Sequence, residues 1–140
     1  MTTDVPLLRQ PRRYFTPDEA NAILSTMRAR LAELERGLDR AHELSTTLER
    51  SATGREVTQA EINALKAEVR AAMDEIVRQG VEIKGVRPAL LDFPALRDGQ
   101  EVYLCWKEGE EVISHWHPMH TGIGGRCPLE GDTAAWTWFD

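Results

Sequence analysis

The chain has 140 residues, of which 41% are hydrophobic and 29% are charged, and its formal net charge is −6. This length fits one domain with a modest core, and the acidic balance argues against a large nucleic-acid-binding surface. Two cysteines are too few for a disulfide framework, and no apolar stretch has the length of a membrane span or the position of a signal peptide. We therefore expect a cytoplasmic protein that binds neither nucleic acid nor membranes.

The first half of the chain begins with a strong helix signal. Thr16 and Glu19 form a capping box around Pro17, which suits the first helical position, so a helix is expected over residues 17–49. Its apolar residues repeat at steps of three and four, as in a heptad seam. The seam consists of Leu24, Met27, Leu31, Leu34, Leu38, Ala41 and Leu48. At ~1.5 Å per residue this helix would be about 50 Å long.

A second helix is expected over residues 58–79. Thr58 and Glu61 make another capping box, and Gly80 stands where a left-handed residue ends a helix. A short polar loop between the two helices predicts an antiparallel helical hairpin. Because such a hairpin reaches past a small sheet, part of its apolar seam would stay exposed. We therefore expect a homodimer that forms through the helices.

The second half of the chain carries strand patterns and all four tryptophans. Pro94 is expected to end one strand, while Asp98-Gly99 and residues 108–110 supply turns. The strand segments are residues 81–84, 90–93, 102–106 and 112–117. They predict three or four antiparallel strands within residues 81–117, with one face packed on the helices. Residues 118–140 are expected to form an irregular aromatic tail that covers a sheet edge or a partner surface.

These elements predict an α+β fold in which a long antiparallel helical hairpin packs on a small 3-4-stranded antiparallel sheet. The whole chain, residues 1–140, is expected to form a single domain.

Residues 115–120 hold three of the four histidines in six positions. Neutral imidazole is the commonest protein ligand for transition metals, so this segment predicts a metal site. On a strand His115 and His117 share one face, and the turn after Pro118 would bring His120 back toward it. We expect His117 as the principal ligand and His115 and His120 beside it, with Cys105 or Cys127 as an additional ligand. Zinc is the first choice, followed by iron, copper, or a haem whose iron one histidine binds.

Several metal-free interpretations stay open. The histidines would then be structural, and the protein an interaction module that uses its helical seam and tail aromatics to bind itself or a partner.

Cys105 and His117 would form a nucleophile pair only if they lie within ~3–4 Å of each other. Residues 122–126 would bind an anion or, as we favour, form a packed turn with Arg126 in a salt bridge. Asp92 and Glu101 would support the histidines or, as we favour, be solvated. The pattern identifies no reaction and no small-molecule ligand.

Several short motifs are distinctive, and they are Arg13 to Asn21, Val81 to Lys84, Leu91 to Pro94, Leu104 to Trp106, Gly109-Glu110, Trp116-His117 and Gly122 to Arg126. Through these motifs the chain resembles, over about residues 12–129, a small bacterial family of uncharacterised proteins catalogued as a domain of unknown function. The resemblance implies a single domain and implies no activity. The family pattern often has an acidic residue where this chain has His120, and carboxylate and imidazole both bind metals.

Overall fold

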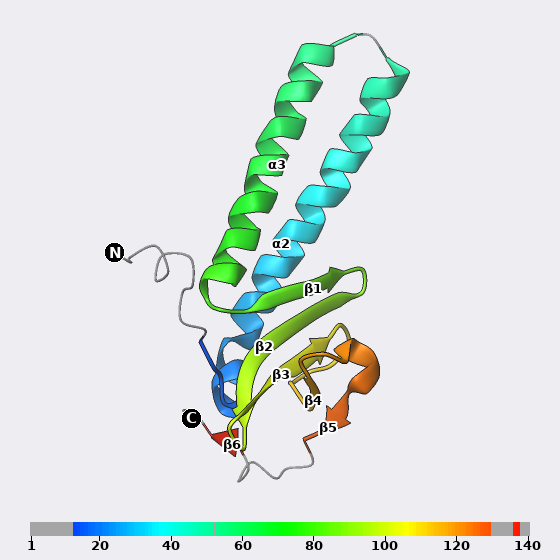
Figure 1. Cartoon of the computed structure of the whole chain (residues 1–140). Helices are drawn as coiled ribbons and strands as arrows, with labels where there is room; N and C mark the ends of the chain where they lie inside the picture. Colours follow the sequence, from blue (N-terminus) through cyan, green and yellow to red (C-terminus); the bar gives the residue numbers. More distant parts are fainter. Residues whose placement is uncertain (1–12, 52, 130–135, 138–140) are drawn as a thin grey trace, which may run out of the picture.

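The computed structural model describes residues 13–51, 53–129 and 136–137. Two antiparallel helices, α2 (Pro17–Arg50) and α3 (Arg55–Arg78), form a hairpin that extends well beyond the sheet at its base (Figure 1). The other elements are β1 (Glu82–Val86), β2 (Ala89–Arg97), β3 (Gln100–Lys107), β4 (His115–Pro118), the 3-10 helix η1 (Gly122–Gly125), β5 (Cys127–Pro128) and β6 (Trp136–Thr137). The predicted α+β class, a helical hairpin packed on an antiparallel sheet, is confirmed. No helix in the described part of the chain is long and apolar enough to cross a membrane.

Helix α2 begins as the sequence predicts but changes its buried face halfway along. The Thr16 hydroxyl accepts a hydrogen bond from the Glu19 N–H, and the Glu19 carboxylate accepts one from the Thr16 N–H, each at 2.9 Å. The predicted seam is buried as far as Leu34, after which burial passes to Gly37 and Leu44, while Leu38 is 41% exposed. The cause is the close approach of α3, because a Cβ atom on Gly37 would lie 2.7 Å from Cγ2 of Val69.

Helix α3 begins at Arg55, three residues before the predicted start, so the capping box at Thr58 does not form. Gly54 precedes the helix with a φ of 72°, and the Thr58 N–H donates to the Gly54 carbonyl within the first turn. The Arg55 guanidinium donates to the carbonyl oxygens of Leu48 (2.7 Å) and Ser51 (3.4 Å), which lie at the end of α2. The early start therefore satisfies carbonyls that the end of α2 leaves without helical partners.

The end of α3 matches the prediction. Gly80 has a φ of 89° and its N–H donates to Val77, while the Val81 N–H reaches back to the Ile76 carbonyl. These two bonds make the Schellman ending that Gly80 indicates, and they lead the chain directly into β1.

The sheet contains more strands than predicted. In the part of the chain that the structure describes, six antiparallel strands pair in the order β1-β2-β3-β4-β5, and β6 pairs with β2. The predicted turn at Asp98-Gly99 is confirmed, since both residues have positive φ angles and join β2 to β3 directly. The tail is therefore less irregular than expected, and β6 covers part of an edge of β2. Trp138 and Phe139 of the predicted aromatic tail lie outside the described residues.

Strand β2 continues through Pro94, where the sequence predicts its end. The Pro94 carbonyl accepts a hydrogen bond from the Phe15 N–H (2.7 Å), on the edge of β2 opposite β3. Strand β1 does not extend to Pro94, because Glu82, the first residue of β1, pairs with Asp92. The N–H that proline lacks would face that same edge, so the strand loses no ladder bond.

Strand β4 is shorter than predicted and begins at His115. The preceding segment forms a loop in which Val112 is exposed, while Ile113 is buried and donates its N–H to the side chain of Asn21 (2.7 Å). This contact with α2 draws residues 111–114 away from the ladder. The loop sets the register of β4 on β3, in which Cys105 lies opposite His115 and Tyr103 opposite His117.

Both faces of the central strands are buried. Leu91 and Phe93 of β2 and Leu104 and Trp106 of β3 belong to the hydrophobic core, together with residues of α2 and α3. Because side chains alternate along a strand, the residues between them lie on the opposite face. That second face contains a polar cluster rather than a second apolar core.

Candidate metal centre

Three potential ligands of different chemistry meet on the second face of the sheet. Asp92 of β2 pairs with Cys105 of β3. His117 of β4 pairs with Tyr103, which lies two residues before Cys105 on β3 and therefore on the same face. One ligand atom from each of these three residues lies within 4.8 Å of the other two. Asp92, Cys105 and His117 are only 2–3% exposed. We call this group the Asp-Cys-His cluster.

The hydrogen bonds of His117 fix which of its nitrogens can bind a metal. Nδ1 lies 2.7 Å from the carbonyl oxygen of Pro118, and a carbonyl can only accept, so Nδ1 is the protonated nitrogen. In the neutral imidazole Nε2 then carries a lone pair. Nε2 lies 3.2 Å from both carboxylate oxygens of Asp92, whose lone pairs face it. A positively charged group, either a proton or a metal ion, is needed between these atoms.

Asp92 is also the anchor of a wider charge network. Its Oδ2 lies 3.4 Å from Nζ of Lys84, which lies 3.4 Å from Oε1 of Glu82 and 4.2 Å from the centre of the Tyr103 ring. The Tyr103 hydroxyl donates to the Glu82 carboxylate at 2.9 and 3.0 Å. Burial lowers the pKa of Lys84, but Asp92, Tyr103 and Glu82 outweigh it and raise that pKa above its ordinary 10.5. Lys84 therefore carries a positive charge beside the cluster.

The backbone explains why Lys84 reaches Asp92. The pairing of β1 with β2 shifts between Ile83 and Gly85, which leaves Lys84 as the extra residue of a β-bulge. A bulge turns a side chain away from its regular direction and is common beside functional sites. The sequence pattern does not indicate this role for Lys84, because a bulge leaves no signal in an alternating pattern.

Cys105 is held as a neutral thiol when no metal is bound. Burial, followed by the negative charge of Asp92, raises the pKa of the Cys105 thiol to about 12. A nucleophilic cysteine needs the opposite shift, because the thiolate is the reactive form. The predicted nucleophile pair of Cys105 and His117 therefore has little support from the electrostatics of the site.

The structure brings together only two of the five predicted ligands. His115 is half-buried on the same strand, but its Nδ1 lies 3.0 Å from the Ser114 hydroxyl and 3.6 Å from a carboxylate oxygen of Glu110. His120 is exposed after the end of β4. The Cys127 thiol donates to the Gly125 carbonyl at 3.5 Å. These three residues lie outside the Asp-Cys-His cluster, which contains Cys105 and His117.

The prediction that Asp92 is solvated is wrong, because Asp92 is buried in the cluster. The signal was available, since Asp92 stands between Leu91 and Phe93 in an apolar strand. An acidic residue at such a position needs a partner when the second face is also covered.

The predicted salt bridge of Arg126 is confirmed, because its guanidinium donates to the Glu110 carboxylate at 2.6 and 2.8 Å.

A cavity of about 210 Å³ lies beside the cluster. Asp92 and Cys105 line it together with Lys84, Leu90, Gly122 and Ile123. Two of the three cluster residues therefore face an open space, and η1 supplies part of its wall.

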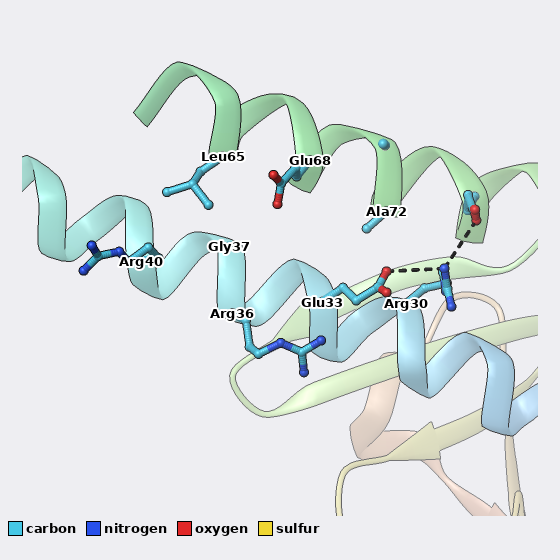
Figure 2. A pocket seen from close by; sticks show the side chains of 10 residues that line it. Arg30, Glu33, Arg36, Gly37, Arg40, Leu65, Glu68 and Ala72 are labelled. Atoms are coloured by element: carbon cyan, nitrogen blue, oxygen red, sulfur yellow. Dashed lines mark ion pairs between the residues drawn. The ribbon is translucent and has the colours of Figure 1, made fainter. Parts of the chain in front are cut away.

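The helical hairpin contains larger hollows with a different character. One of them, of about 620 Å³, lies between α2 and α3 over Gly37 and Ala72 (Figure 2). Arg30 pairs there with Glu33 (3.4 Å) and Glu75 (3.8 Å). The positive and negative charges that line this hollow therefore largely compensate one another. A second hollow of about 360 Å³ is lined by Leu38, Ala41, Lys66, Val69, Arg70, Met73 and Asp74. Neither hollow contains the Asp-Cys-His cluster.

Comparison with known proteins places the chain in a family. The family model described as "Uncharacterized conserved protein (DUF2203)" matches residues 13–129. A search of curated proteins and a search of solved structures each find no match. The matched segment includes α2, α3, strands β1 to β5 and all three residues of the Asp-Cys-His cluster. Because the model matches most of its length, the chain belongs to the family of uncharacterized conserved proteins DUF2203.

Proposed function

We propose that the protein binds one divalent transition-metal ion between Asp92, Cys105 and His117. The observation that carries this proposal is the orientation of His117, whose Nδ1–H is committed to the Pro118 carbonyl while Nε2 faces the Asp92 carboxylate. Metal-binding histidines usually donate their second nitrogen in this way, which fixes the ring and its tautomer. The thiol of Cys105 completes a set of nitrogen, oxygen and sulfur donors within 4.8 Å of one another.

Zinc is the metal that this donor set favours. Zinc accepts thiolate, imidazole and carboxylate ligands together, and sites with three protein ligands keep a fourth position for water or substrate. Iron and copper are the next candidates. We favour a bare ion over haem, because the adjacent cavity of about 210 Å³ is smaller than the roughly 300–1,000 Å³ of typical cofactor pockets.

The surrounding residues suit a metal site that is preorganised in the metal-free protein. The Pro118 carbonyl orients His117, and the ammonium group of Lys84 lies 3.4 Å from Oδ2 of Asp92. In this proposal His115, His120 and Cys127 are not ligands, so the ligands come from three strands and not from residues 115–120 alone.

The test compares metal content and thermal stability of the untagged protein with three cluster variants, Asp92→Asn, Cys105→Ser and His117→Ala. Wild-type protein should retain metal after purification and lose it to a chelator. Adding back zinc should raise its melting temperature, since a ligand at about 100 times its Kd adds about 2.7 kcal/mol to stability. Each cluster variant should lose most of the metal and most of that stabilisation.

His120→Ala and Cys127→Ser are matched controls, because they remove the same kinds of side chain outside the cluster. Both should bind metal as the wild type does. Loss of metal in these controls would contradict the proposed ligand set. If zinc, iron and copper all leave the wild-type melting temperature unchanged, the metal proposal is wrong.

We propose as a second candidate function that the hairpin binds a second copy of the chain. Leu38 and Met73 are 41% and 43% exposed, and they line the more apolar hollow of the hairpin. Lys66 and Asp74 flank Arg70 at equal spacing on α3. An antiparallel copy centred on Arg70 would place each Lys66 opposite an Asp74 of its partner, but it would also bring the two Arg70 side chains together, so the dimer would depend mainly on the apolar contact of Leu38 and Met73.

Light scattering tests this candidate directly. A dimer at micromolar concentration that dissociates in Leu38→Arg would support it, because the charge would enter an apolar contact. Lys107→Glu, on the sheet, should leave the dimer intact. A wild-type monomer at that concentration would contradict the candidate, and would leave the metal proposal unaffected.

A further inference from the structure

We propose that the metal site binds a small carboxylate-type anion in the adjacent cavity, between the metal and the ammonium group of Lys84. This inference rests on the proposed metal site and adds the class of ligand that occupies its open position. The cavity, the charge of Lys84 and the size of the space each support it.

The cavity adjoins the proposed metal position. Asp92 and Cys105 belong both to the Asp-Cys-His cluster and to the cavity wall. A metal held by these residues and His117 has one position left in a four-coordinate arrangement, and open positions accept water or small ligands. His117 does not line the cavity, since its ring lies against Pro118 and Tyr103. The cavity is therefore the space into which an exchangeable ligand would enter.

Lys84 supplies a positive charge at the same cavity. Its ammonium group has three N–H donors, and the described residues offer it two carboxylate acceptors, Glu82 and Asp92, each at 3.4 Å. When Asp92 coordinates a metal, its charge is shared with the ion, and Lys84 loses part of its partner. An anion bound to the metal would replace that partner and accept a charged hydrogen bond from Lys84.

The size and polarity of the cavity limit the ligand. At about 30 Å³ per water, a space of about 210 Å³ holds roughly seven water molecules. Leu90 and Ile123 give it apolar walls, which suit the hydrocarbon part of a short carboxylic acid. The carboxylate would face the metal and Lys84. A neutral amide of the same shape would lack the charge that Lys84 recognises.

The test uses the full chain loaded with cobalt(II) in place of zinc, because the visible bands of cobalt change when its ligands change. Acetate and formate are the probes, with acetamide as the neutral control. Acetate should shift the wild-type spectrum in a saturable way, and acetamide should not. Lys84→Met should weaken acetate binding about tenfold, as expected for the loss of a charged hydrogen bond. Lys84→Arg should largely restore it.

Lys107→Met removes an exposed lysine of β3 outside both proposed sites and should bind acetate as the wild type does. A cobalt spectrum that acetate does not change would overturn the proposed anion site and leave the metal site standing. Equal acetate affinity in Lys84→Met and wild type would also overturn it. Failure of the wild-type protein to form a coloured cobalt complex would overturn the metal site itself, and the anion site with it.

Discussion

The buried thiol of Cys105 makes a quantitative prediction for the metal-free protein. The pKa of this thiol is about 12 in the folded chain, against an ordinary 9.0. Below pH 9 the thiol is protonated in both the folded and the unfolded chain, and its contribution to stability is constant. Between pH 9 and pH 12 only the folded chain keeps the proton. The free energy of unfolding therefore falls as the pH rises through this range.

The size of the effect follows from linkage. A group that keeps its proton only in the folded state costs about 1.4 kcal/mol of stability per pH unit, so about 2 kcal/mol is lost by about pH 10.5. The assay is urea unfolding of chelator-treated wild type and Cys105→Ser from about pH 7.5 to about pH 10.5. Subtracting the two curves removes the contributions that both proteins share, and the difference should shrink by about 2 kcal/mol across the range.

Zinc should reverse the sign of this pH dependence. Zinc binds the thiolate and releases its proton, so the apparent zinc affinity of the wild type should rise more steeply with pH than that of Cys105→Ser. The expected difference is about tenfold per pH unit for one released proton. A stability difference between the two metal-free proteins that is independent of pH would refute the assignment of a buried neutral thiol.

Three further predictions concern the fold. Gly37→Ala should destabilise the hairpin by about 1 kcal/mol, because crowding against Val69 outweighs the better helix propensity of alanine; in a Val69→Ala background the same change should stabilise it. Leu31→Ala should cost about 2–5 kcal/mol, since Leu31 is in the core, whereas the half-exposed Leu38→Ala should cost less than about 1 kcal/mol. Asp98→Val should cost about 1–2 kcal/mol, because Asp98 has a positive φ, and Asp98→Gly should not. Urea unfolding measures all three.

The helical hairpin could be predicted because its signals are local. The capping box at Thr16 and the left-handed glycine at Gly80 act within one or two turns of helix, and both form as predicted. The Asp98-Gly99 turn is equally local, since two residues with positive φ angles are sufficient to define it. The predicted burial of Leu38 is wrong, because burial at this point of α2 depends on how closely α3 approaches Gly37. That distance belongs to the packing of two helices and not to either helix alone.

The candidate site shows the same division more clearly. The sequence indicated a metal site and named His117 and Cys105, because imidazole and thiol are recognisable by residue type alone. It placed the remaining ligands on the nearest histidines in the chain, whereas the structure places Asp92 beside them. A strand brings together residues that are distant in sequence, so neighbours in the chain are poor guides to neighbours in a site.

By itself, then, the sequence determined the fold class, the hairpin and its caps, and two residues of the cluster. Tertiary structure alone decided the register of β4 on β3, the bulge that brings Lys84 to Asp92, and the choice of Asp92 as the third member. The physical reason is that helix caps and tight turns are stabilised by bonds between residues a few positions apart. Strand register and burial of a charge depend on which surfaces meet after the chain has folded.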